Sequence, residues 1–256
     1  MATSLRVLLV TLAVHAGLLA YGLLPLAASA QVTWTYGSGG STVDGSGNAV
    51  DQPRVVGPFR GLVVNGPVDV RLKAGNAQRV VVHADDNIVP LIQTQVVDDK
   101  LVVDVMAGAS FRTRSRMYAE VTFRELSSVL IKGSGDVRAD RIVTPIFDTT
   151  IRGSGDVVID ALESDAVALS ISGSGDFTAA GRAPKLGVVI VGSGDVRADK
   201  LEAQDVAVRI RGSGDVRVHA TNTLQVDIAG SGDVRYRGEP TVTKKVAGSG
   251  DVAPLR

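Results

Sequence analysis

The chain lacks cysteine, carries few aromatic residues and has no net charge. Without cysteine it forms no disulfide and cannot be lipidated at a lipobox, so its 256 residues, 45% of them apolar, must supply the core unaided. Aromatic residues make up only 4%, which predicts an aliphatic core. The 27 basic and 27 acidic residues cancel, so no overall field attracts nucleic acid or an anionic membrane, and we expect no nucleic-acid partner.

A five-residue motif, Gly-Ser-Gly-Asp-Val with one Phe variant, recurs seven times in the second half of the chain. Successive copies are separated by 20, 20, 19, 20, 18 and 18 residues. The copies start at Gly133, Gly153, Gly173, Gly192, Gly212, Gly230 and Gly248. Such regular spacing is typical of a solenoid, in which one short unit is stacked repeatedly and each unit is stabilised by its neighbours.

The residues around each motif alternate between apolar and polar with the period of a strand. Val208 and Ile210 are predicted to face inward, whereas Arg209 and Arg211 face outward. The residue two positions before each motif forms one inward column, made up of Ile131, Ile151, Ile171, Ile190, Ile210, Ile228 and Val246. The residue four positions before the motif forms a second inward column, made up of Val129, Thr149, Leu169, Val188, Val208 and Val226. The fifth residue of each motif forms a third apolar column.

The repeat predicts an all-β fold, a right-handed parallel β-helix built as a single-stranded solenoid. The richness in β-branched residues disfavours helices, and a unit of this length is too short for a propeller blade. Equivalent residues of successive coils should then stack about 4.8 Å apart. We interpret each Gly-Ser-Gly-Asp as the corner of a coil, since glycine permits positive φ and aspartate caps its own turn.

The N-terminal 30 residues have the pattern of a secretory signal peptide. Arg6 precedes the apolar stretch Val7–Leu26, and Ala28-Ser29-Ala30 forms an A-x-A cleavage site. We therefore expect a periplasmic, secreted or surface-held protein with no membrane span after cleavage. The apolar stretch is long enough that an uncleaved membrane anchor is the alternative.

The remaining chain divides by composition into three parts. Residues 31–50 are predicted to be a Gly/Ser-rich linker. Residues 51–126 are predicted to be an irregular β segment that caps the end of the helix, with Asn65-Gly66-Pro67-Val68-Asp69-Val70 resembling one corner. Residues 127–252 form the repeat with its seven corners. Lys244 falls in an inward column, which marks a terminal coil.

Stacking predicts a column of aspartates, namely Asp136, Asp156, Asp176, Asp195, Asp215, Asp233 and Asp251. Like charges about 5 Å apart repel by roughly 1 kcal/mol in water, so compensation is required. Arginine follows two residues later in four copies, at Arg138, Arg197, Arg217 and Arg235, which favours an interleaved Asp/Arg ladder. The calcium-binding β-roll, with glycine and aspartate in both half-turns, is the alternative. Only one corner per coil carries aspartate here, so we expect no cofactor.

Ligand binding is a weaker signal than the fold. Outward arginines are candidates for bidentate contacts with an acidic polysaccharide, and their competing interpretation is pairing with the aspartate column. The candidates are Arg152, Arg209, Arg211, Arg217 and Arg235. Sugar sites favour aromatic platforms, but the coils contain only Phe147, Phe177 and Tyr236, of which the two phenylalanines are expected in the core.

Residues 55–252 resemble the bacterial putative auto-transporter adhesin, head GIN domain family. The resemblance rests on Phe59-Arg60-Gly61-Leu62-Val63-Val64-Asn65-Gly66, on the string of Gly-Ser-Gly-Asp corners, and on Tyr236-Arg237-Gly238-Glu239-Pro240. The opening signature is looser than the glycine-isoleucine-asparagine of the family. The resemblance implies an exported β-helix similar to pectin lyases in fold, with a role in adhesion or polysaccharide binding and no established catalytic residues.

The sequence therefore predicts an exported, non-enzymatic envelope protein. An adhesin or polysaccharide-binding role is the first hypothesis, and a structural scaffold that binds another envelope protein is the alternative. A carbohydrate-active enzyme would need a clustered acid and base. His83 and His219 each stand singly in strand-like stretches, and no Gly-x-Ser-x-Gly nucleophile motif occurs.

Overall fold

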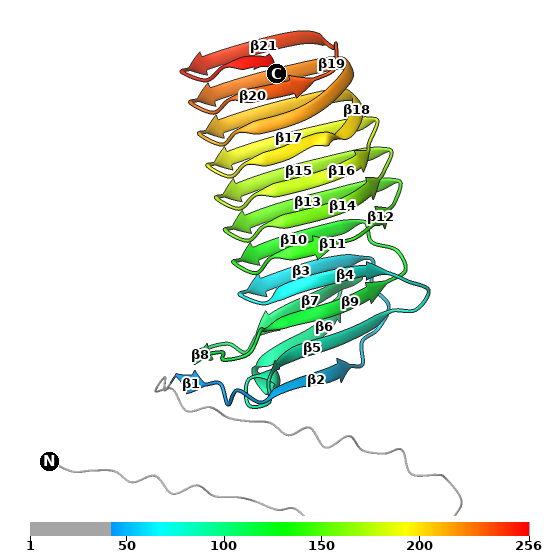
Figure 1. Ribbon diagram of the computed structural model, residues 1–256, viewed down its shortest axis with the longest axis vertical. Coiled ribbons are helices and arrows are strands. Elements are labelled where there is room, and N and C mark those ends of the chain that lie inside the picture. The colour runs from blue at the N-terminus through cyan, green and yellow to red at the C-terminus, as the bar shows by residue number, and fades with distance from the viewer. Residues whose placement is uncertain (1–41, 256) are drawn as a thin grey trace, which may run out of the picture. The chain divides into compact units, whose positions relative to one another are not determined.

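The computed structural model describes residues 42–255, and these form a β-solenoid of stacked parallel strands (Figure 1). The one helical element in this range is the short 3₁₀ helix η1 (Val89–Leu91). The predicted all-β class and stacked parallel architecture are confirmed. The predicted signal peptide and residues 31–41 of the predicted linker lie outside the described residues. Across residues 42–255, no helix has the length and apolar character that crossing a membrane requires.

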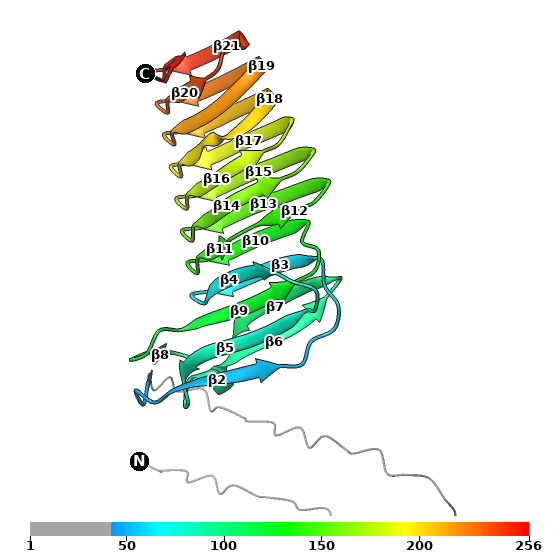
Figure 2. The same cartoon turned by 45° about the vertical axis from the view of Figure 1, so that its right-hand side comes forward.

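Each repeat coil consists of two strands joined by the Gly-Ser-Gly-Asp turn. We call the sheet of strands that precede the turns the pre-turn sheet, and the sheet of strands that follow them the post-turn sheet. In both sheets each strand pairs parallel with the next along the stack. The turns line one edge of the stack, on the left in Figure 2.

The pre-turn sheet contains, in order, β7 (Lys100–Val105), β3 (Gly61–Gly66), β10 (Ser128–Gly133), β13 (Ile146–Gly153), β15 (Ala166–Gly173), β17 (Lys185–Gly192), the second halves of β18 (Val196–Gly212) and β19 (Val216–Gly230), and β21 (Thr241–Gly248). The post-turn sheet contains β9 (Tyr118–Phe123), β4 (Asp69–Ala74), β11 (Val137–Ala139), β14 (Val157–Glu163), β16 (Phe177–Arg182), the first halves of β18 and β19, β20 (Val234–Arg237) and β22 (Val252–Pro254). The two-residue strand β12 (Ile142–Val143) pairs with β14.

The inward columns predicted from the sequence form the core. The six isoleucines in the column two residues before the turns, from Ile131 to Ile228, are fully buried. The column from Val129 to Val226 is at most 3% exposed, and Phe147 and Phe177 are fully buried, as predicted. Because side chains alternate between faces, a one-residue slip of β18 would exchange buried Ile210 for Arg209 or Arg211, so the apolar pattern holds the register.

The N-terminal part closes one end of this core with antiparallel strands. β2 (Ala49–Arg54) pairs with β5 (Arg79–Asp85), β5 pairs with β9, and β6 (Ile92–Val97) pairs with β7, all antiparallel. The Arg54 guanidinium donates to the carbonyls of Val89 (2.8 Å) and Ile92 (3.0 Å), which fixes η1 against the end of the stack. This is the irregular capping segment that the sequence predicted.

The predicted Gly/Ser-rich linker is wrong for residues 43–50, which are part of the cap. β1 (Val43–Asp44) pairs with β8 (Phe111–Arg112), and β2 begins at Ala49. Between them, the turn at Gly47 donates its amide to the buried Asp85 carboxylate (3.1 Å). That carboxylate also accepts from the Ser115 hydroxyl (2.7 Å), which together with backbone amides lowers the pKa of Asp85. A glycine-rich composition alone did not reveal this buried partner.

Two glycines on β17 differ in whether the stacked fold leaves room for a side chain. At Gly192, where φ is +137°, an added Cβ would lie 2.3 Å from the Gly173 carbonyl oxygen. At Gly187 the nearest atom to an added Cβ would be 3.9 Å away, and the backbone is in an ordinary strand conformation. Gly192 is therefore required by stacking, whereas Gly187 is not.

We expect Gly192→Ala to lower the free energy of unfolding by about 2–4 kcal/mol, because neither the backbone angle nor the stacked turn tolerates a methyl group. Gly187→Ala is the matched control and should leave it unchanged or raise it by up to about 1 kcal/mol. Urea denaturation of the two variants measures both. Equal losses would contradict the assigned role of the turn.

Candidate functional site

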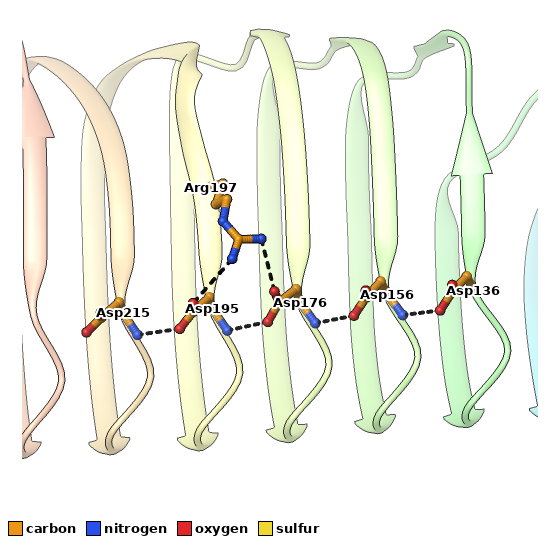
Figure 3. Close-up of polar contacts among 6 residues, drawn as sticks. All are labelled: Asp136, Asp156, Asp176, Asp195, Arg197 and Asp215. Atoms are coloured by element: carbon orange, nitrogen blue, oxygen red, sulfur yellow. Dashed lines mark hydrogen bonds and ion pairs between the residues drawn. The ribbon is translucent and has the colours of Figure 1, made fainter.

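The turn aspartates form a continuous hydrogen-bonded ladder along the stack. The backbone amide of each aspartate donates to the Oδ1 of the aspartate one coil earlier, at 2.8–3.0 Å in all seven steps. Figure 3 shows five of these carboxylates, from Asp136 to Asp215, in one file. The first acceptor is Asp69, so the ladder has one more member than the sequence repeat suggested. The signal was present in the Asn65-to-Val70 segment that resembles a corner.

Backbone carbonyls complete the same connection in the opposite sense. The amide of Val157 donates to the Asp176 carbonyl at 2.9 Å, and Phe177 donates to the Asp195 carbonyl at 2.9 Å. Each aspartate thus joins its coil to the neighbours through both its side chain and its backbone. An amide donor favours the ionised carboxylate, so the ladder offsets the repulsion expected between stacked like charges.

Arginine contributes to this ladder at two places. Arg197 bridges Asp176 (3.0 Å) and Asp195 (3.4 Å), as Figure 3 shows. Arg235 bridges Asp233 (3.1 Å) and Asp251 (2.8 Å). The two other arginines of the predicted interleaved ladder do not join it.

Arg138 pairs instead with Asp160 (3.0 Å), and Arg217 makes no ion pair among residues 42–255. The interleaved arrangement is therefore local, and amide donors provide the general compensation. Because Oδ1 of each inner aspartate already accepts an amide, the column has a complete role in the fold without an ion. Within residues 42–255, no three His, Cys, Asp or Glu side chains are grouped so as to hold a metal.

Ion pairing with arginine lowers the pKa of two aspartates. The hydrogen bond from Arg235 is the main cause that lowers the pKa of Asp251. The hydrogen bond from Arg211 likewise lowers the pKa of Asp227, which lies on the opposite sheet.

The two sheets expose opposite charge, although the chain as a whole is neutral. In the repeat coils, the two outward columns that start at the turn aspartates carry seven Asp and four Arg, so these two columns on the post-turn side have an excess of three negative charges. The outward positions of the pre-turn sheet carry six basic and three acidic side chains, an excess of three positive charges. The basic residues are Lys132, Arg152, Lys185, Arg209, Arg211 and Lys245, and the acidic ones are Asp148, Asp205 and Asp227.

The five candidate arginines are divided between these faces. Arg152, Arg209 and Arg211 lie on the pre-turn sheet, and Arg217 and Arg235 lie on the post-turn sheet. Arg209 and Arg211 both approach Asp227, at 3.8 and 3.2 Å. Because two arginines share one carboxylate, this spot keeps a positive charge and unused guanidinium donors.

A shallow groove lies beside this arginine pair. Two adjoining depressions of about 190 and 330 Å³ share Gly187, Ala207 and Gln225 as their floor. The first is bordered by Arg209 and Asp227 and the second by Lys185, Asp205 and Thr223. The groove exists because Gly187 and Ala207 are small at a position where fold packing does not require glycine. A flat floor with charged borders fits an extended polar chain.

A larger groove, of about 760 Å³, lies at the edge of the stack opposite the turns. Its lining includes Pro145, Pro184, Glu163, Asp165 and Arg182. Glu163 is paired with Arg141 at 2.9 Å, outside the groove lining. Its charges are mixed and no set of side chains converges on one point, so it defines no ligand chemistry.

Sequence reasoning missed an aromatic cluster in the cap. Tyr118 stacks on His83, with ring centroids 4.3 Å apart, and the Arg71 guanidinium lies 3.8 Å from the tyrosine ring centroid. His83 also contacts Asp51 (2.5 Å). Both faces of the Tyr118 ring are occupied, so it stabilises the cap and is not a free platform for a sugar. Only the pairing of β4, β5 and β9 brings these residues together.

Comparison with known proteins gives one family and several similar structures. The model of the family "Putative auto-transporter adhesin, head GIN domain" matches residues 58–240. Among curated proteins, none matches the chain. A putative adhesin from Bacteroides fragilis has a TM-score of 0.80 at 24% identity, covering 83% of this chain and 100% of that one.

Two structures from Parabacteroides distasonis share the same fold. A putative lipid binding protein has a TM-score of 0.71 at 20% identity, and a putative adhesin has 0.67 at 23%. Each covers 84% of this chain and 100% of its own. At these identities the likeness establishes the fold alone.

We expect Asp156→Ala to lower the free energy of unfolding by about 1–2 kcal/mol, because the Asp176 amide loses its acceptor. Asp156→Asn keeps an oxygen acceptor and removes only the charge, so it should stay within about 0.5 kcal/mol of the parent. Urea denaturation compares them. If both variants lose the same stability, charge rather than the amide acceptor governs the ladder.

Thermal stability should fall as the pH drops below about 4. A carboxylate whose pKa is lower in the folded than in the unfolded chain stabilises the fold above the unfolded value, and this contribution disappears as the pH falls through the folded value. Arg235→Gln removes the main cause that lowers the pKa of Asp251, so its loss of melting temperature between pH 7 and pH 3 should be smaller than the parent's. Scanning calorimetry measures both, and an unchanged or larger loss contradicts the assignment.

Proposed function

Because this chain belongs to the putative auto-transporter adhesin, head GIN domain family, we propose that it is an exported, non-enzymatic adhesin whose pre-turn sheet binds an acidic polysaccharide. The family description and the adhesin names of similar structures support the adhesive role. The proposal that the protein is exported rests on the signal-peptide pattern of residues 1–30. The ligand class rests on the charge and shape of the pre-turn face.

The observation that carries the ligand class is the basic excess on the pre-turn sheet beside the Gly187 groove. Arg209 and Arg211 share Asp227 there, which leaves guanidinium donors directed outward. A uronate carboxylate can replace water on such donors in bidentate geometry. Gln225, on the groove floor, supplies an amide for sugar hydroxyls.

Repetition makes up for the lack of aromatic platforms. The basic side chains of the pre-turn sheet lie on five different strands, β10, β13, β17, β18 and β21, and neighbouring strands are about 4.8 Å apart, so a long polymer contacts several coils at once. Many weak contacts on one chain raise the overall affinity through effective concentration. A polymer therefore suits this surface better than an isolated monosaccharide.

The same geometry supports a non-catalytic role. Cleavage of a glycosidic bond needs a carboxylic acid with a raised pKa beside a second carboxylate. The ladder carboxylates each accept the backbone amide of the next turn, so they are engaged in stacking the coils. His83, stacked against Tyr118, is committed to the cap.

The test compares two charge-matched double variants. Arg209→Gln/Arg211→Gln removes two positive charges from the pre-turn face, and Arg138→Gln/Arg217→Gln removes two from the post-turn face. With immobilised polygalacturonate as probe, we expect the first to bind about tenfold more weakly and the second within about twofold of the parent. Binding of the parent should weaken with added salt.

Equal affinity of all three proteins, or no retention of the parent, would overturn the polysaccharide assignment. A neutral dextran surface is the control for nonspecific retention. Circular dichroism of the variants establishes that the fold is retained.

A further inference from the structure

The two ends of the solenoid are finished differently. The N-terminal end is covered by the antiparallel cap and η1, as the lower part of Figure 1 shows. At the other end, β21 pairs with β19 on one side only, within residues 42–255. Val246 of β21 is 38% exposed, whereas Ile228, which precedes it in the same column, is fully buried. The last coil therefore leaves an apolar edge uncovered.

This last coil presents the groups that every inner coil uses to hold its successor. The Asp251 amide donates to Asp233 Oδ1 at 2.9 Å as in the earlier turns, and within residues 42–255 no following turn aspartate donates its amide to the Asp251 carboxylate. β21 also offers one unpaired row of backbone donors and acceptors. An exposed strand of this kind is a template for another chain.

Lys244 is the one residue of this edge that breaks the pattern. It is in register with Val226, and its column otherwise holds Val129, Thr149, Leu169, Val188, Val208 and Val226. The Lys244 Nζ donates to the Val252 carbonyl at 3.3 Å, so the side chain reaches from the pre-turn sheet to the post-turn sheet across the open end. A strand added to this end would bury that ammonium group, which is costly without a partner.

We propose that Lys244 keeps the C-terminal end of the solenoid from associating with a second copy of this chain through β21. A second copy fits the end because an exposed strand is complementary to its own antiparallel copy, which produces a closed twofold dimer. In that dimer the two Lys244 ammonium groups would be buried together at the interface. Their like charge and lost hydration oppose the pairing. This inference is independent of polysaccharide binding.

The experiment uses the full chain and three substitutions on β21. Lys244→Val restores the apolar residue of the column and should at least double the molar mass measured by size-exclusion chromatography with light scattering. Lys245→Val is the matched control, since it removes the same charge from the same strand at an outward position. Lys244→Glu keeps a charge at the inward position. The parent and both of these variants should stay monomeric.

The proposal is overturned if Lys244→Val remains monomeric with a native circular dichroism spectrum. It is equally overturned if the parent associates, or if Lys245→Val associates as strongly as Lys244→Val. Lys244→Thr, which copies Thr149 of the same column, is the second variant if the valine protein does not fold. Association of the threonine variant supports the proposal, and a folded, monomeric threonine variant contradicts it.

Discussion

The structure depends on the close nesting of consecutive Gly-Ser-Gly-Asp turns. A Cβ at Gly192 would lie 2.3 Å from the Gly173 oxygen, and one at Gly194 would lie 2.2 Å from the Gly175 oxygen. Each turn therefore serves as the surface on which the next one packs. Since the turns fit in one alignment only, the strands on both sides enter their sheets in register, and the aliphatic columns follow.

The same stacking places like charges in a file, and the backbone resolves this conflict. Each aspartate accepts the amide of its successor, and Arg197 and Arg235 add ion pairs at two places. The column is thus committed to the fold. The outward side chains of the pre-turn sheet are not needed to hold neighbouring coils together, because the coils stack there through backbone hydrogen bonds. This freedom is the physical reason why we propose the Gly187 groove and the arginines beside it, and not the aspartate column, as the ligand surface.

Within residues 42–255, the two ends of the stack differ in how they cover the core. The N-terminal cap reverses strand direction and is fixed by buried Asp85 and by Arg54. At the C-terminal coil a single charged side chain, Lys244, lies across the apolar opening. A cap covers the core completely, whereas a lysine leaves Val246 partly exposed and works by making burial costly.

The sequence by itself determined the repeat, the strand alternation, the buried columns and the positions of the seven Gly-Ser-Gly-Asp turns, because each coil repeats one local pattern. It did not place Arg209 and Arg217 on opposite faces, join Asp69 to the aspartate ladder or bring Tyr118 onto His83. It also misassigned residues 43–50, whose partner Asp85 lies far along the chain. Only the tertiary structure decided these points, because they depend on which distant strands become neighbours in the cap and on the strands before and after each turn lying in separate sheets.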